Sequence, residues 1–190
     1  MSSLSARNQL LVGLLLALTM VATRLQHACG AGHILDASWA VLFLGGFYLR
    51  SSWAFAALMA EAVLVDLAAI TWGGVSSVCI SPAYALLLPA HGALWLAGRW
   101  YAANYRPTSS TLPTLAGSLF VGTALAELIA SGGFYLFSGR FAEISLAGFG
   151  GRLVEYFPTS LEGTALYVGL AAIAHMAVLS LRDRPALRAT

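Results

Sequence analysis

Residues 53–70 read WAFAALMAEAVLVDLAAI and decide the fold of this chain. The stretch is largely apolar apart from Glu61 and Asp66, and it approaches the length of about 20 apolar residues that a helix needs to cross a bilayer. The whole chain has the same character, because 59% of its residues are hydrophobic, 9% are charged and the mean hydropathy is +0.79. An ordinary soluble domain carries about 25% charged residues, so the composition excludes a soluble protein.

Five further apolar runs, bounded by polar residues or by glycine and proline, accompany this stretch. Together they predict an all-α, polytopic membrane protein, a bundle of six transmembrane helices that forms a single transmembrane domain over residues 1–190. The first run follows an arginine as in a signal peptide, but no clear small-residue cleavage site comes after it, so we expect a retained helix. The predicted spans are residues 8–23, 37–49, 53–70, 82–100, 112–137 and 161–181.

All ten basic residues are arginines, and a formal net charge of +2 is too small and too scattered for a nucleic-acid partner. With the N-terminus in the cytoplasm, seven arginines lie inside and three, Arg24 among them, lie outside, in agreement with the positive-inside rule. Both termini are then cytoplasmic, and the outer loops are residues 24–36, 71–81 and 138–160. The last of these loops is apolar enough to lie on the membrane surface or to cap a site.

Several of the few polar side chains fall at one predicted depth, near the outer ends of the spans. An ionisable group at membrane depth is costly unless it is paired or faces a water-filled cavity, so each one needs an explanation. Apolar and aromatic walls with a few convergent polar groups are the general form of a small-molecule site. We therefore predict a ligand site at the outer face, formed by Asp66, Tyr84, Cys79, His27, Asp36 and Trp39.

Cys79 is the sharpest candidate in this set, and it has three interpretations. A thiolate is a soft ligand that suits soft or borderline metals. A disulfide with Cys29 is the second interpretation, since both cysteines face the oxidising side in the predicted topology. The third is an inert buried thiol, because free cysteine is among the most buried residue types. The spacing of the two cysteines leaves all three open.

Four other polar residues, His91, His175, Glu61 and Glu127, fall inside the predicted spans. The two histidines differ in depth by about 7 Å at 1.5 Å per residue, which makes them poorly matched as haem ligands. Each of the four has a structural interpretation as a hydrogen-bonding group between helices. The functional alternatives are a ligand role for the histidines and a proton or substrate relay for the glutamates.

Two segments are the most distinctive parts of the sequence: residues 33–49, HILDASWAVLFLGGFYL, and residues 79–84, CISPAY. In these segments, in Asp66, and in its length and number of spans, the chain resembles the BtuM family of predicted cobalamin transporters. That family is related to the S components of energy-coupling-factor transporters. The resemblance implies an S-component-like bundle in the bacterial inner membrane that binds cobalamin near its outer face. It also implies that the Cys79 thiolate is the axial cobalt ligand, supported by Asp66 and Tyr84, with His27 nearby.

A thiolate on one axial face of cobalt should weaken the bond to the group on the opposite face, so we expect bound cyanocobalamin to release its cyanide. The partner implied by the resemblance is an energy-coupling module. However, the first span carries only Gly13 and Ala17 where many S components have a run of alanines. Two other function classes remain open: an intramembrane haem or redox protein, and a structural membrane subunit without a ligand.

Overall fold

The computed structural model describes residues 5–28, 35–73 and 81–187, and within these ranges the side chains of residues 25–28, 109 and 182–187 are left aside. Throughout this part of the chain the regular structure is helical, which confirms the predicted all-α class. The elements are α1 (Ala6–Ala28), α2 (Ser38–Tyr48), α3 (Trp53–Trp72), η2 (Pro82–Leu86), α4 (Leu87–Asn104), η3 (Ser109–Thr111), α5 (Leu112–Phe137) and α6 (Leu146–Leu187), where η marks a 3₁₀-helix.

Four of the six α-helices are long and apolar enough to cross a membrane, namely α1, α3, α5 and α6. Helix α2 has 11 residues, or a length of about 16 Å, which is far short of the roughly 30 Å hydrocarbon core. Most of its side chains are buried among the other helices, so its polar backbone lies inside protein. The protein is therefore a helical membrane bundle built around a short central helix.

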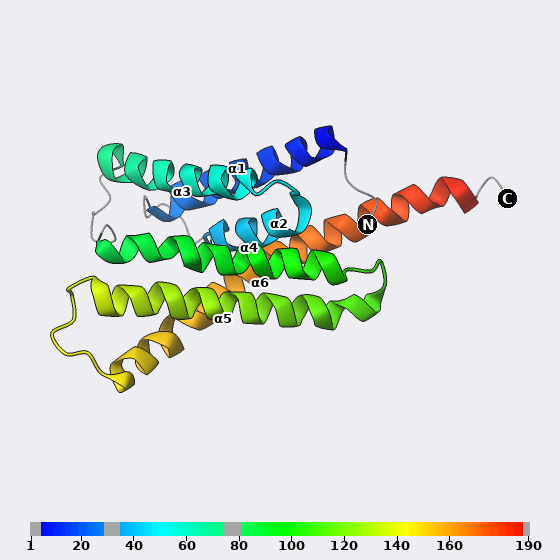
Figure 1. Ribbon diagram of the computed structural model, residues 1–190. Coiled ribbons are helices and arrows are strands. Elements are labelled where there is room, and N and C mark those ends of the chain that lie inside the picture. Colours follow the sequence, from blue (N-terminus) through cyan, green and yellow to red (C-terminus); the bar gives the residue numbers. More distant parts are fainter. Residues whose placement is uncertain (1–4, 29–34, 74–80, 188–190) are drawn as a thin grey trace.

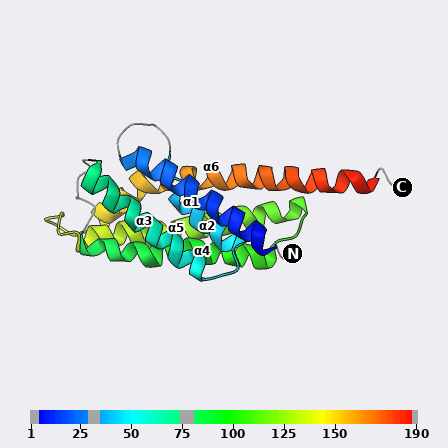
Figure 2. The same cartoon turned by 90° about the horizontal axis from the view of Figure 1, so that it is seen from above.

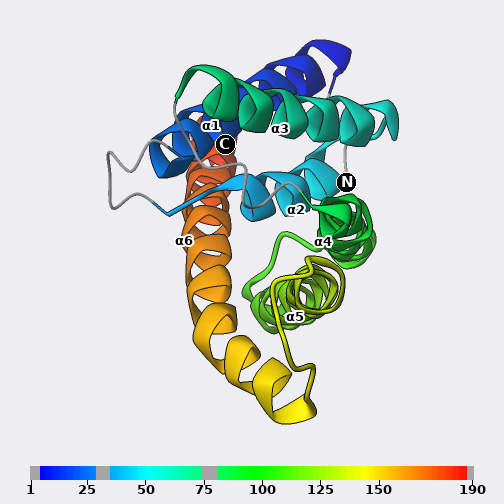
Figure 3. The same ribbon diagram turned by 90° about the vertical axis from the view of Figure 1, so that its left-hand side faces the viewer.

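The other helices surround α2 (Figure 1). Viewed along the bundle, α1 and α3 lie on one side of α2, α4 and α5 lie on another, and α6 runs past them as a separate long helix (Figure 3). The main partners of α2 are α4, α1 and α6, and α5 packs against α4 and α6. Helices α1 and α3 end, and α4 begins, at the same end of the bundle, on the left in Figure 1. We call this the Arg24 end.

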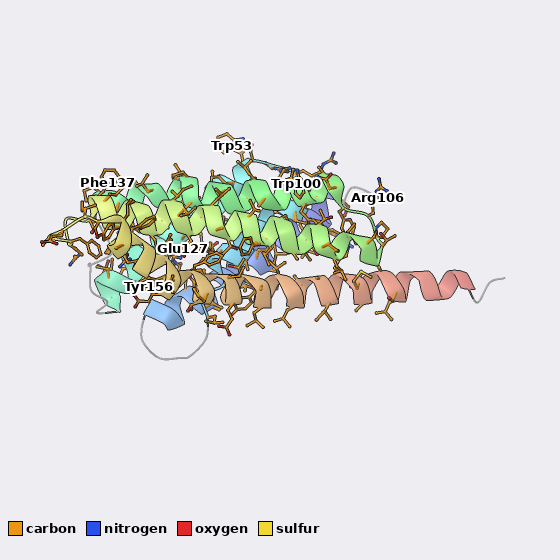
Figure 4. All side chains as sticks on the ribbon, turned by 90° about the horizontal axis from the view of Figure 1, so that it is seen from below. Trp53, Trp100, Arg106, Glu127, Phe137 and Tyr156 are labelled. Atoms are coloured by element: carbon orange, nitrogen blue, oxygen red, sulfur yellow. The ribbon has the colours of Figure 1, made fainter. Side chains whose placement is uncertain are left out.

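The distribution of apolar side chains is that of a membrane protein. Phe43 and Leu42 of α2 and Leu94 of α4 are almost fully buried. At the same time, many leucines of α1, α3, α5 and α6 are exposed on the outer faces of the helices. Figure 4 shows many side chains that project outward from the bundle. An apolar surface of this extent requires lipid, not water, as its solvent.

Helix α6 differs from the prediction. The expected outer loop 138–160 is short, because the helix already begins at Leu146 and continues through Pro158. Proline cannot donate to the carbonyl one turn earlier, and the ribbon bends between its first turns and the remainder (Figure 3). With 42 residues and a length of about 63 Å, α6 extends well beyond the other helices at its C-terminal end (Figure 2).

Candidate functional site

Arg24, in the last turns of α1, forms the centre of a charged cluster at the Arg24 end. Its Nε donates to Oδ1 of Asp66 at 2.6 Å, and its Nη2 donates to Oδ2 of the same carboxylate at 2.7 Å. This bidentate pairing, with two parallel hydrogen bonds, is the strongest geometry available to an arginine and a carboxylate. It joins α1 to α3 at the depth where both helices end.

The third guanidinium nitrogen reaches the start of α2. Nη1 of Arg24 donates to Oγ of Ser38 at 2.9 Å and lies 3.4 Å from Oδ2 of Asp36. Asp36 in turn accepts from the backbone N–H of Ser38 at 2.9 Å and from its hydroxyl at 2.7 Å. A carboxylate suits this position because the first N–H groups of a helix have no partner within the helix. Arg24 thereby links α1 to the first residues of α2.

Tyr84 completes the cluster from the 3₁₀-helix η2. Its hydroxyl donates to Oδ2 of Asp66 at 2.6 Å, so that carboxylate accepts hydrogen bonds from both α1 and η2. We define the Arg24 cluster as Arg24, Asp36, Ser38, Asp66 and Tyr84. It ties together α1, α2, α3 and η2 at this end of the bundle, where the backbone N–H of Ala37 also donates to the Thr23 hydroxyl of α1 at 3.1 Å.

The Arg24 cluster is partly withdrawn from solvent and is electrically unbalanced. The exposed fraction of the side chain is 14% for Arg24, 21% for Asp66 and 28% for Asp36. Two carboxylates face one guanidinium, which gives the cluster a formal charge of −1. Within the partly buried site, the Coulomb attraction is stronger than in water. A ligand that presents hydrogen-bond donors or a positive centre would complement this charge.

A cavity of about 560 Å³ opens beside the Arg24 cluster, between α3 and the start of α4. Arg24, Tyr84 and His91 supply its polar wall, and apolar residues such as Met59 and Leu88 supply the rest. His91 is 2% exposed. The volume is in the range of small-molecule sites, and the mixture of apolar walls and a few polar groups is typical of them.

The structure brings three of the predicted site residues together, Asp66, Tyr84 and Asp36. Trp39 follows Ser38 on α2 and packs against the hydrophobic core. His27 lies in the last turn of α1, but its side chain is outside the described part, as is all of Cys79. The thiolate interpretation and the disulfide with Cys29 therefore concern residues that the structure does not describe.

Sequence reasoning missed Arg24 and Ser38 as site residues. Arg24 was counted as an outer topology marker, although the structure uses it as the partner of two acids. A signal was present in the sequence, because two carboxylates were predicted at one membrane depth and such groups need a partner. Arg24 was one of the three arginines predicted on the outer side.

The remaining polar candidates lie in separate places. His91 lines the cavity beside Arg24, whereas Nδ1 of His175 lies 3.0 Å from the Tyr48 hydroxyl in a different cavity. Glu127 is buried between α5 and α6 (Figure 4), where its carboxylate accepts hydrogen bonds from Ser131 and Ser160. These contacts agree with the structural interpretation of Glu127, a hydrogen bond between helices.

Glu61 has a different setting, in the wall of an open groove of about 1000 Å³ between α1 and α3. Across the residues that the structure describes, no group of three metal-ligating side chains lies together.

Comparison with protein-family models finds no match for this chain, and a search of curated proteins finds no relative. The geometry and the sequence therefore carry the functional argument.

Proposed function

We propose that this protein is a membrane uptake component that binds and transports cobalamin, with the Cys79 thiolate as the axial ligand of cobalt. One observation carries the proposal. The two segments on which the resemblance to the BtuM family depends lie far apart in sequence, yet Asp36 from the first and Tyr84 from the second meet in the Arg24 cluster. Asp66, the third element of the resemblance, bonds to both Arg24 and Tyr84.

Covalent geometry relates Cys79 to this cluster. Cys79 stands five residues ahead of Tyr84 in the sequence, and five residues span at most about 18 Å. A corrinoid bound at the Arg24 end is therefore within reach of both the thiolate and the cluster. The formal charge of −1 favours the positive cobalt centre and the amide N–H groups on the rim of the corrin ring.

The proposed chemistry is a ligand substitution on cobalt. The thiolate donates an electron pair to one axial face, and the bond between cobalt and cyanide on the opposite face breaks, with cyanide leaving with its electron pair. The cobalt keeps its oxidation state, so the step requires no reductant. Uptake and removal of the upper axial cyanide would then depend on the same sulfur atom.

Purified protein mixed with cyanocobalamin is expected to shift the corrin absorption spectrum and to release free cyanide. Cys79→Ala should abolish both effects because it removes the sulfur that is proposed as the axial ligand of cobalt. The chain offers a matched control in its second cysteine, since Cys29→Ala should leave the shift and the cyanide release intact. An unchanged spectrum with the wild-type protein, or equal behaviour of the wild type and Cys79→Ala, would overturn the proposal.

The setting of the proposed transporter follows from the same resemblance. We place it in the bacterial inner membrane with both termini in the cytoplasm, which puts the Arg24 end at the outer face. Its partners are then the lipid bilayer, the corrinoid and an energy-coupling module. The groove between α1 and α3, lined by Gly13 and Ala17, is where a helix of such a module could approach closely.

The haem alternative receives no support from the geometry, because His91 and His175 line different cavities. A structural subunit would account for the small residues along the groove between α1 and α3. It would leave the convergence of Asp36, Asp66 and Tyr84 on Arg24 without a function.

A further inference from the structure

A basic patch lies at the end of the bundle opposite the Arg24 end, on the right in Figure 1. The segments at this end are residues 5–9 at the start of α1, residues 49–56 around the connection from α2 to α3, and residues 98–112 between the end of α4 and the start of α5. These segments contain no aspartate or glutamate, and their four arginines give them a formal charge of +4. The four are Arg7, Arg50, Arg99 and Arg106.

Two of these arginines meet at the connection between α2 and α3. Nη1 and Nη2 of Arg99, near the end of α4, both donate to the backbone carbonyl of Arg50 at 3.2 Å. The Arg99 guanidinium also lies over the Trp95 ring, 5.7 Å from its centroid, and that ring contacts Phe55 of α3. The backbone N–H of Arg50 donates to the Gln9 side chain of α1. Both arginines are therefore anchored at one junction of α1, α2, α3 and α4.

These contacts leave most of the hydrogen-bonding capacity of the two guanidinium groups unused. A guanidinium has five N–H groups, and the Arg50 carbonyl accepts from both terminal nitrogens of Arg99. The Arg50 side chain is exposed, and within the described part of the chain neither arginine pairs with a carboxylate. A phosphate group matches two such cations, because its oxygens accept charge-assisted hydrogen bonds from both.

Exposed tryptophans beside the two arginines indicate that the phosphate belongs to a lipid. Trp53 of α3 is 82% exposed and stands three residues after Arg50, and Trp100 of α4 is 55% exposed and follows Arg99 directly. Tryptophan is enriched at the headgroup level of a bilayer, where its ring is apolar and its N–H is polar. Leu96, one turn before Trp100 on the same face of α4, is 66% exposed. The arginines therefore lie at phosphate depth, next to an apolar surface.

The charge of the patch favours an anionic lipid over a zwitterionic one. A choline headgroup carries its own positive charge beside the phosphate, and the arginines repel it. An anionic headgroup lacks that charge, and each arginine near the membrane surface is expected to increase its affinity about fivefold. A free phosphate ion would pair with the guanidinium groups but would make no use of the exposed tryptophans and Leu96.

We propose that the connection between α2 and α3, together with the end of α4, is a binding site for the headgroup of an anionic phospholipid. Arg50 and Arg99 bind the phosphate, Trp53 and Trp100 lie at the level of the glycerol, and an acyl chain follows the face of α4 past Leu96. The site lies at the opposite end of the bundle from the candidate corrinoid site and does not depend on it.

Phosphatidylglycerol and phosphatidylcholine with identical acyl chains are the probes, and native mass spectrometry of the full chain in detergent measures the bound lipid. The wild type should bind its first phosphatidylglycerol at least about tenfold more tightly than its first phosphatidylcholine. Arg50→Gln and Arg99→Gln should each reduce this preference about fivefold, and the double variant should remove nearly all of it. Arg140 is the matched control, an exposed arginine after the end of α5, and Arg140→Gln should leave the preference unchanged.

Two further arms separate a lipid site from a site for a free anion and from loss of the fold. Glycerol phosphate has the phosphate without acyl chains and should not displace phosphatidylglycerol at equal concentration; equal competition would overturn the proposal. Equal affinity of the wild type for the two lipids would also overturn it, as would a preference that Arg50→Gln and Arg140→Gln change equally. If Arg99→Gln fails to fold, Arg50→Gln still decides, because the Arg50 side chain is exposed and its carbonyl is retained.

Discussion

Arg24→Met is expected to destabilise the protein by at most about 3–5 kcal/mol, the cost of removing one partner from a fully buried ion pair, because the Arg24–Asp66 pair is only partly buried. The variant leaves the Asp66 carboxylate with the Tyr84 hydroxyl alone, and it removes the donor that links Asp36 and Ser38 to α1. Both acids are mostly shielded from solvent, so water cannot replace the guanidinium fully. Thermal unfolding in detergent is the measurement.

Three further variants test whether the pairing is the cause. Arg24→Lys keeps the charge but cannot form two parallel hydrogen bonds with Asp66, so an intermediate loss is expected. The double variant Arg24→Met with Asp66→Leu should recover at least half of the loss, because no uncompensated carboxylate remains on α3. Arg106, an exposed arginine, is the matched control, and Arg106→Met should have little effect. An Arg24→Met variant as stable as Arg106→Met would contradict the predicted role of the cluster.

The bounds of long apolar helices were predicted correctly where polar residues, glycine or proline flank the apolar run. The span predicted over 53–70 corresponds to α3, Trp53–Trp72, and the span predicted over 112–137 coincides with α5. In both cases the membrane requirement for a continuous apolar helix dominates the local preferences. The short run 37–49 became the short central helix α2, which can be short because protein surrounds it.

The start of α6 was missed for a physical reason. Pro158 and the glycines near the start of α6 are typical of a loop, and both disfavour a helix interior. Tertiary packing outweighs these local preferences. The Phe149 ring packs beside Gly132 of α5, and a Cβ atom built at Gly132 would lie 3.6 Å from this ring, an ordinary van der Waals contact. The ring pair of Phe149 and Tyr135 adds a further contact between the two helices.

In the candidate site too, the sequence predicted what depends on local position, and it did not predict what depends on the packing of the helices. The depth of Asp66, Tyr84 and Asp36 could be read from the spans, because depth follows from position along a membrane helix. Their common partner, Arg24, could not be predicted in this way. Counting charges assigned Arg24 only to the outer side, whereas its pairing depends on which helices lie side by side in the fold. The role of Cys79 stays a prediction that the corrin spectrum tests.

Gly98→Ala is expected to disrupt the contact between α2 and α4, with a loss of about 3 kcal/mol or more, at or above the top of the usual range for overpacking. A Cβ atom at Gly98 would lie 1.9 Å from the carbonyl oxygen of Phe43. From the other side of the same contact, a Cβ atom at Gly46 would lie 2.1 Å from the carbonyl oxygen of Trp95. The obstacles are backbone atoms, so neither helix can yield by a side-chain rotation.

The matched control for this prediction is on the same helix. A Cβ atom at Gly92 would meet nothing within 4 Å, so Gly92→Ala should be neutral or slightly stabilising through helix propensity. Thermal unfolding in detergent compares the two variants, and equal stability would contradict the close contact. Helix α2 also carries Ser38 of the Arg24 cluster. Separating it from α4 should therefore weaken the corrin spectral shift, whereas Gly92→Ala should preserve it.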